Sequence, residues 1–260
     1  MRYIRLIRNI SNWWVYLLVK YGLSRQDPIL FRTRNAVLVE VPWRLLHTFK
    51  EIFMEECYMH GVGAPLPDRP VIIDIGANAG YFTLFAAARF PSATILSFEP
   101  IPKNYRLLEQ NVRANPGCRI LPLQLAVAAE SGEAIMSFDE EDSVSTAAHI
   151  VTQDASLHQT GTIKVPCTTL AEIFDRHHLD RCDLLKIDCE GAEYEILYRC
   201  PPQTLAKIRQ MAIEVHSGPS PEYQPESLKA YLHSQGFETY ETSRALGMLW
   251  ARRNEERQTR

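Results

Sequence analysis

The sequence of 260 residues lacks paired cysteines, an excess of basic residues and any apolar run long enough to span a bilayer. Its six cysteines include no C-x-x-C pair, which argues against a zinc site or a disulfide framework. Reduced thiols in a cytoplasmic protein are therefore expected. The net charge of −3 argues against a nucleic-acid partner, because phosphate binding requires a strongly basic surface. Internal repeats and low-complexity segments are also missing.

The N-terminal segment, residues 1–34, differs in charge from the whole chain. It holds seven Lys/Arg residues and a single acid, Asp27. Its longest uncharged run, residues 9–19, contains Trp13 and Trp14 but is shorter than the roughly 20 residues that cross a bilayer. No small-residue cleavage site follows, so a signal peptide is not expected. Peripheral contact with a membrane surface is one interpretation. Packing on the catalytic domain or on a second subunit is favoured, because aromatic stripes usually bury into protein.

A glycine- and proline-rich linker, residues 61–70, divides the chain into two expected parts. Residues 1–60 are predicted to form a helical N-terminal extension, with a short strand over 36–41 and an amphipathic helix over 43–58. Residues 61–260 are predicted to form the main domain. Strands and helices alternate there, which predicts a Rossmann-like α/β fold with a mostly parallel sheet and helices on both faces.

The later part of the main domain departs from simple alternation. Residues 133–138 are predicted to add a hairpin strand, and residues 237–242 and 248–252 to form an antiparallel pair. Residues 139–162 show no clear periodicity, and a segment of that length is typical of a lid, a binding loop or a surface loop. The acceptor pocket is expected to draw on this segment, on the N-terminal segment and on residues 216–224.

The most informative motif is a strand, a glycine turn and a helix start over residues 71–83. Gly76 and Gly80 bracket the turn, where glycine permits positive φ and close approach of a ligand. The free N–H groups at the start of the next helix favour an anionic group. The spacing is not the G-x-G-x-x-G of dinucleotide sites, which argues against a nicotinamide-dependent oxidoreductase.

Two acids indicate which cofactor this turn holds. Asp74 ends the strand, where it would repel a pyrophosphate but attract an ammonium or sulfonium group. Glu99 follows the second strand, where a carboxylate can accept hydrogen bonds from the two hydroxyls of a ribose. S-adenosylmethionine carries these groups and no phosphate. The candidate cofactor-binding residues are Asp74, Gly76, Ala77, Asn78, Gly80, Tyr81, Glu99, Pro100 and Ala126.

A second group of ionisable residues follows the strand predicted over 183–188. Lys186 and Asp188 share one face of this strand because side chains alternate, and Glu190 lies in the turn that follows. His216 follows the strand predicted over 211–215, together with Glu214. The carboxyl ends of parallel strands are where α/β enzymes place their sites. The candidate catalytic residues are Asp188, His216, Glu190 and Lys186.

Three motifs in order resemble the FkbM-type methyltransferases, a family of class I S-adenosylmethionine-dependent O-methyltransferases. They are D-I-G-A-N-A-G-Y-F-T from Asp74, F-E-P followed by K-N from Phe98, and L-K-I-D-C-E-G-A-E-Y-E-I-L from Leu185, with E-V-H at Glu214. The resemblance covers residues 36–250. It implies a seven-stranded sheet with a terminal antiparallel strand, and methylation of a hydroxyl on a sugar, glycan or secondary metabolite.

The resemblance also implies roles for individual residues. Asp74, Gly76, Asn78 and Gly80 would surround the methionine part of the cofactor, Glu99 would bind ribose, and residues 124–126 would lie near adenine. Lys186, Asp188, Glu190 and Glu193 occupy the second motif, and His216 lies in the last. Nothing carries over to the first 35 residues.

The mechanism that the sequence favours is in-line methyl transfer to a hydroxyl oxygen, with His216 or Asp188 as the base. In a variant of this mechanism, Asp188, Glu190 and His216 bind a divalent cation. A non-catalytic, membrane-associated cofactor-binding module is the alternative. The methyl acceptor, the use of a metal and the oligomeric state are open at this point.

Overall fold

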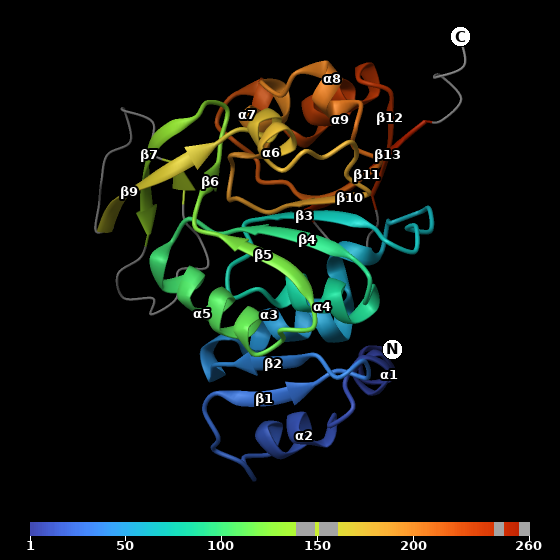
Figure 1. The fold of residues 1–260 in the computed structure, drawn as a ribbon, viewed down its shortest axis with the longest axis vertical. Coiled ribbons are helices and arrows are strands. Elements are labelled where there is room, and N and C mark those ends of the chain that lie inside the picture. The colour runs from blue at the N-terminus through green and yellow to red at the C-terminus, as the bar shows by residue number, and fades with distance from the viewer. Residues whose placement is uncertain (139–148, 151–160, 242–246, 255–260) are drawn as a thin grey trace.

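A computed structural model describes residues 1–138, 149–150, 161–241 and 247–254 (Figure 1). Its centre is a seven-stranded sheet with the order β12-β13-β11-β10-β3-β4-β5. Among these strands only β13 runs against both of its neighbours. The strands are β3 (Val71–Ile75), β4 (Thr94–Phe98), β5 (Arg119–Leu123), β10 (Leu184–Ile187), β11 (Gln210–Glu214), β12 (Phe237–Tyr240) and β13 (Met248–Arg253). The predicted mostly parallel sheet and its antiparallel C-terminal pair are confirmed.

The strand order reverses between β3 and β10, and this reversal places the site. Strand β4 extends the sheet on one side of β3, and β10 pairs with the other side. Residues Ile72 to Ile75 of β3 are buried, as expected for a central strand that is covered on both faces. Ligands of open α/β sheets bind outside the carboxyl ends of the strands at such a reversal.

Helices cover both faces of this sheet, as predicted (Figure 1). On one face lie α4 (Tyr81–Arg89) and α5 (Pro102–Arg113). On the other lie α6 (Leu170–Arg176), α7 (Glu193–Tyr198), α8 (Pro202–Leu205), the 3₁₀ turn η4 (Pro221–Tyr223) and α9 (Pro225–Ser234). The sequence did not predict α8 or α9. Helix α9 buries only Leu228 and Leu232, a single i, i+4 pair that is too short to stand out as a periodic pattern.

The N-terminal segment contains a β-hairpin as well as the helices that were predicted. Helices α1 (Arg2–Asn9) and α2 (Trp14–Lys20) are followed by an antiparallel hairpin of β1 (Ile29–Arg32) and β2 (Leu38–Val41). The prediction of a strand over 36–41 is confirmed from Leu38 onward, whereas Ala36 has φ +63° and lies before the strand. Strand β1 was missed, because its four residues are too few to show a clear alternation.

The single helix predicted over residues 43–58 is wrong. The structure has a 3₁₀ turn η1 (Trp43–Leu45), a short helix α3 (Leu46–Lys50), a π-helical turn η2 (Glu51–Glu55) and a 3₁₀ turn η3 (Cys57–Met59). Glu56 adopts a left-handed conformation with φ +57°, which ends the helical path. The apolar residues do follow a helical spacing, but tertiary packing determines the local backbone conformation.

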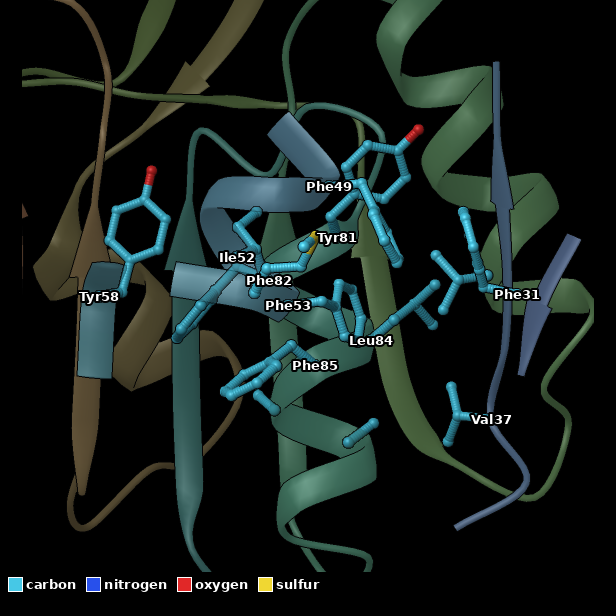
Figure 2. Close-up of a cluster of buried hydrophobic side chains, with 14 of the residues drawn as sticks. Phe31, Val37, Phe49, Ile52, Phe53, Tyr58, Tyr81, Phe82, Leu84 and Phe85 are labelled. Carbon is cyan, nitrogen blue, oxygen red and sulfur yellow. The ribbon is translucent and has the colours of Figure 1, made fainter. Parts of the chain in front are cut away.

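Aromatic packing joins the N-terminal segment to the main sheet (Figure 2). Phe31 of β1 stacks on Phe49 with ring centroids 4.1 Å apart, and Phe49 stacks on Phe53 at 4.9 Å. Phe53 meets Phe85 of α4 edge-on at 5.5 Å. These residues share one hydrophobic cluster with Ile72 of β3. Residues before the linker are therefore part of the main core and do not form a separate unit.

A second, four-stranded sheet lies beside the first, with the order β6-β9-β7-β8. Its strands are β6 (Ala126–Val127), β7 (Gly132–Phe138), β8 (His149–Ile150) and β9 (Gly161–Thr168). The predicted hairpin strand is thus present, and it pairs antiparallel with β9. Most of the segment predicted as a lid or loop, residues 139–148 and 151–160, lies outside the described residues. None of the helices in the described ranges is both long and apolar enough to cross a membrane.

Candidate functional site

A cavity of about 250 Å³ lies at the carboxyl ends of β3, β4 and β10. Its walls are formed by the glycine turn after β3, by the residues after β4 and β10, and by the segment before the linker. The lining includes His47, Thr48, Glu51, Ile52, Tyr58, Ile75, Gly76, Ala77, Asn78, Ala79, Tyr81, Phe82, Glu99, Pro100, Ala126, Lys186, Asp188, Glu190 and Glu214. The cavity therefore lies at the reversal of strand order, where the fold favours a ligand site.

The turn after β3 lies tightly against the segment that follows β10. Gly76 has φ +73°, and a Cβ added there would lie 1.7 Å from the carbonyl oxygen of Asp188. Gly80 has φ +85°, and its added Cβ would lie 2.6 Å from Leu108 Cδ1. Only glycine fits both the dihedral angles and the available space. The two glycines are thus required to bring the β3 turn, α5 and the β10 end together.

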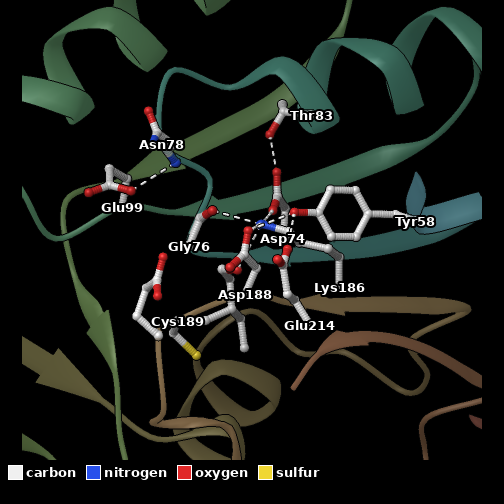
Figure 3. Close-up of polar contacts among 12 residues, drawn as sticks. Tyr58, Asp74, Gly76, Asn78, Thr83, Glu99, Lys186, Asp188, Cys189 and Glu214 are labelled. Carbon is white, nitrogen blue, oxygen red and sulfur yellow. Dashed lines mark hydrogen bonds and ion pairs between the residues drawn. The ribbon is translucent and has the colours of Figure 1, made fainter. Parts of the chain in front are cut away.

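Glu99 and Asn78 form the wall of the cavity next to β4 (Figure 3). Glu99 Oε2 accepts a hydrogen bond of 2.8 Å from the backbone N–H of Asn78, and Oε1 accepts one of 2.9 Å from that of Ile101. Burial raises the pKa of Glu99 to about 7, although these two backbone donors oppose the shift. Oε1 also accepts from Asn104 Nδ2 at 3.5 Å, whereas Oε2 can accept a further hydrogen bond, so Glu99 can still receive a ligand hydroxyl.

Asp74 lies beneath the cavity and is not part of its lining. Its carboxylate is buried, with Oδ1 3.2 Å from Lys186 Nζ, and Oδ2 accepts a hydrogen bond of 2.6 Å from Thr83. The expectation that Asp74 attracts a cationic group directly therefore needs correction. Its charge is already paired with Lys186, and its position supports the turn from below.

Lys186 connects the two acids at the base of the site. Its Nζ donates a hydrogen bond of 2.7 Å to the carbonyl of Gly76 and lies 3.6 Å from Asp188 Oδ2. Burial alone would lower the pKa of Lys186, but the charges of Asp74 and Asp188 outweigh it and raise the pKa above its usual value. Lys186 is thus a fixed cation that holds the glycine turn and Asp188 in place.

Tyr58 brings two carboxylates together at the edge of the cavity (Figure 3). Its hydroxyl donates a hydrogen bond of 2.6 Å to Asp188 Oδ2 and lies 3.2 Å from Glu214 Oε2. Trp250 fixes Tyr58 by donating a hydrogen bond of 2.8 Å to its carbonyl oxygen. Burial and the nearby charge of Asp188 raise the pKa of Glu214 to about 7. A carboxylate with that pKa is suited to accept a proton near neutral pH.

His216 is engaged on both ring nitrogens and does not line the cavity. Nδ1 lies 2.8 Å from Glu193 Oε1, and Nε2 lies 3.3 Å from Glu190 Oε2. The hydrogen bond to Glu193 raises the pKa of His216 to about 9, although burial opposes the shift. His216 is therefore protonated at neutral pH. The structure does not favour it as the base, whereas Asp188 remains placed for that role.

The structure brings together most of the residues singled out from the sequence. Of the candidate set, Gly80, Asp74 and His216 lie outside the lining, and the others form part of it. Ligand atoms of Asp188, Glu214 and His216 lie within 4.8 Å of one another. A cation at this point would be bound by Glu214 in place of the expected Glu190. Tyr58 and Glu214 were not among the chosen site residues.

Comparison with known proteins identifies the family of this chain. The family model described as the methyltransferase FkbM domain matches residues 74–239. This chain belongs to the FkbM methyltransferase family. The match begins at Asp74 in β3 and ends in β12, so it covers the carboxyl ends of β3, β4 and β10 that form the cavity. The resemblance predicted from the motifs is confirmed, and membership of this family supports S-adenosylmethionine as the methyl donor.

Individual relatives from fungi and bacteria are similar at moderate identity. Methyltransferase sdnD of Sordaria araneosa is 28% identical over 217 residues, which cover 73% of this chain and 81% of that protein. The 31-O-demethyl-FK506 methyltransferase FkbM of Streptomyces tacrolimicus is 30% identical over 194 residues, covering 65% and 73%. The crystal structure of methyltransferase FkbM from Methylobacillus flagellatus matches with a TM-score of 0.49 and 15% identity, covering 80% of this chain and 54% of that one.

Proposed function

We propose that this FkbM-family methyltransferase transfers the methyl group of S-adenosylmethionine to a hydroxyl oxygen of a small-molecule or glycan acceptor. One observation supports oxygen as the atom that receives the methyl group. Asp188 and Glu214, two carboxylates joined through the Tyr58 hydroxyl, line the same cavity as the glycine turn. A hydroxyl must lose its proton when it is methylated, and this pair is placed to receive that proton. The name of the Streptomyces tacrolimicus relative refers to methylation at an oxygen as well.

The residues around the cavity fit the proposed donor. S-adenosylmethionine, when bound, supplies a methyl group activated by a positively charged sulfur. Glu99 Oε2 can accept a hydrogen bond from a ribose hydroxyl, and the first turn of α4 offers backbone N–H groups to a carboxylate. The Tyr81 hydroxyl is buried in the lining without a hydrogen-bond partner among the described residues, so it can pair with a ligand. These features match a nucleoside joined to an amino acid.

Different residues of this chain have different roles in the proposed transfer. Lys186 holds Asp188 through an ion pair, and Tyr58 orients both carboxylates toward one point. With the donor bound, the acceptor oxygen would gain the methyl group as the sulfur–methyl bond of the donor breaks, S-adenosylhomocysteine would leave, and the acceptor's proton would pass to the Asp188–Glu214 pair. Holding the donor and the acceptor in one cavity keeps the reacting groups aligned. The fixed positions of these side chains account for the catalysis without a covalent intermediate on the protein.

Two measurements test this function in order. Calorimetry with S-adenosylhomocysteine tests the cofactor site, and failure to bind would favour a non-catalytic module. A methyl-transfer screen on glycans and small alcohols then identifies the acceptor. With that acceptor, Asp188→Asn should lower the rate by about 10²–10⁴-fold while cofactor binding persists. The matched control is Glu226→Gln, an exposed carboxylate in α9 that does not line the cavity. Methylation of amines or thiols but not of alcohols would contradict the proposal.

A divalent cation is the alternative way to activate the hydroxyl. Asp188, Glu214 and His216 could supply its ligands, and a bound cation would lower the pKa of the alcohol. The engaged and protonated His216, together with Lys186, already supplies positive charge beside these acids. We therefore expect activity to survive exhaustive chelation. Loss of activity that is restored by adding Mg²⁺ or Mn²⁺ would favour the cation instead.

A further inference from the structure

Exposed apolar side chains gather in the first 43 residues. Of 13 large hydrophobic residues exposed among the described residues, 10 belong to this segment, which is a sixth of the chain. They are Met1, Tyr3, Ile4, Ile7, Trp14, Leu18, Tyr21, Leu23, Leu30 and Trp43. Isolated exposed apolar residues need no explanation, but a concentration of this kind marks an interaction surface.

Helices α1 and α2 arrange these side chains as outward-facing stripes. Trp14, Leu18 and Tyr21 follow the i, i+4, i+7 spacing of one helix face, and they are 51%, 40% and 67% exposed. Ile4 and Ile7 of α1 are spaced i, i+3, with Ile4 71% exposed. In both helices other residues face the core, so these stripes are not needed for folding.

Contacts between the helices hold the two elements that carry these stripes side by side. The Tyr3 and Tyr16 ring centroids are 6.3 Å apart, and Lys20 Nζ donates a hydrogen bond of 2.7 Å to the Tyr3 hydroxyl. Helix α2 lies at the bottom of the molecule in Figure 1, beneath β1 and at the opposite end from α6–α9. We call the exposed faces of α1 and α2 the N-terminal apolar face.

Charge distinguishes this face from the rest of the molecule. Residues 1–34 carry seven basic residues and one acid, a net charge of +6, whereas the whole chain has −3, so residues 35–260 carry −9. The basic side chains at positions 2, 8, 20, 25, 32 and 34 are exposed. Aromatic and aliphatic side chains interleaved with arginine and lysine are typical of helices that lie in the headgroup region of a bilayer.

We propose that the N-terminal apolar face docks on an anionic lipid bilayer. Its positive charge complements anionic headgroups, and its exposed tryptophan and aliphatic side chains enter the boundary with the acyl chains. A symmetric contact between two copies would instead place +6 against +6. A soluble polyanion would use the basic side chains but leave the apolar stripes in water. This inference does not depend on the proposed methyl transfer.

Vesicle sedimentation with the full chain tests the proposal. We expect binding to phosphatidylcholine vesicles that contain phosphatidylglycerol, little binding to pure phosphatidylcholine, and weaker binding as salt rises. The triple variant Ile4→Ser, Trp14→Ser, Leu18→Ser should bind at least about tenfold more weakly. The double variant Arg2→Gln, Lys20→Gln, which removes exposed basic side chains of the two helices, should also lose about tenfold.

A matched control makes the test specific to this face. Leu121→Ser with Ile135→Ser removes apolar side chains of similar exposure, 44% and 46%, from the two sheets, and it should bind vesicles like the wild type. Thermal unfolding checks that each variant folds. No binding to anionic vesicles, or binding that the triple variant leaves unchanged, would overturn the proposal. Self-association in sedimentation velocity that the triple variant abolishes, without vesicle binding, would assign the face to a second copy.

Discussion

Lys186 on β10 stands in register beside Asp74 on β3, and its Nζ lies 3.2 Å from Asp74 Oδ1. Both side chains are buried, and Lys186 also donates to the carbonyl of Gly76. This ion pair therefore ties the two central strands together beneath the glycine turn. The pair gives a structural role to an acid and a lysine on two strands that are distant in sequence.

Removing the lysine should destabilise the protein strongly. Lys186→Met leaves the Asp74 carboxylate buried without a counter-charge, so we expect the free energy of unfolding to fall by about 3–5 kcal/mol. Urea denaturation measures this change. The double variant with Asp74→Asn should recover part of the loss, because the uncompensated charge is gone. Lys164→Met, at a side chain that is 70% exposed, should change stability by less than about 0.5 kcal/mol. Equal effects of both single variants would contradict the argument.

A second prediction concerns the glycine turn. Gly76→Ala forces a residue with a Cβ into φ +73° and against the carbonyl oxygen of Asp188, 1.7 Å away. We expect S-adenosylhomocysteine affinity to fall at least about tenfold and stability to fall by about 1–3 kcal/mol. Calorimetry and urea denaturation measure these effects. Gly117→Ala is the control, because nothing lies within 4 Å of its added Cβ. Unchanged affinity in Gly76→Ala would remove the turn from the cofactor site.

The sequence predicted the sheet because its strands are continuous apolar runs that alternate with helices. The turn residues were found for a related reason, since glycine spacing and strand-end acids are local signals. Asp74 shows the limit of this approach. Its position was predicted correctly, but its partner depends on the register between β3 and β10, and register is a property of the assembled sheet.

The remaining site residues differ in how far the sequence could have found them. Glu214 ends the strand next to β10, so its place at a strand end is a signal in the sequence. Tyr58 gave no signal, because it reaches Asp188 across 130 residues through an irregular segment. Asp188 ends a predicted strand and also lies in the second motif, so both its position and its motif indicated a site. A site residue such as Tyr58 is therefore identified only once the packing of the N-terminal segment is known.

The pH dependence of methyl transfer should follow Glu214. Its pKa is raised to about 7 by burial and by Asp188, and only its ionised form accepts a proton, so the rate should rise as pH increases through about 7. Glu214→Gln should lower the rate and remove this rise. A pH–rate profile with the identified acceptor measures it. An unchanged profile in the variant would assign the titration to another group.

Stability provides an independent check on the same carboxylate. Its folded-state pKa is above the unfolded value of 4.5, so its stabilising contribution is complete below that value and is lost as pH rises through about 7. Glutamine cannot ionise. Glu214→Gln should therefore lose less stability than the wild type between about pH 5 and 8, as measured by urea denaturation at each pH.

His216 should stabilise the fold in the same direction but over a higher pH range. Its pKa is raised from 6.5 to about 9, chiefly by the hydrogen bond to Glu193. The stability that it contributes is complete below about pH 6.5 and is lost as pH rises through about 9. After allowance for the 31% exposure of its side chain, His216→Gln should cost about 1–3 kcal/mol near pH 6 and little by pH 10.

Urea denaturation across this pH range measures the effect of His216→Gln, with His233→Gln as the control. His233 lies on the exposed end of α9, where its Nε2 is 2.8 Å from the Thr239 hydroxyl, so its loss should change stability little at any pH. A difference for His216→Gln that stays constant from pH 6 to 10 would show that packing, and not the imidazolium between Glu193 and Glu190, carries its contribution. A difference that fades through pH 9 would confirm that His216 is protonated at neutral pH and therefore cannot take up the acceptor's proton there.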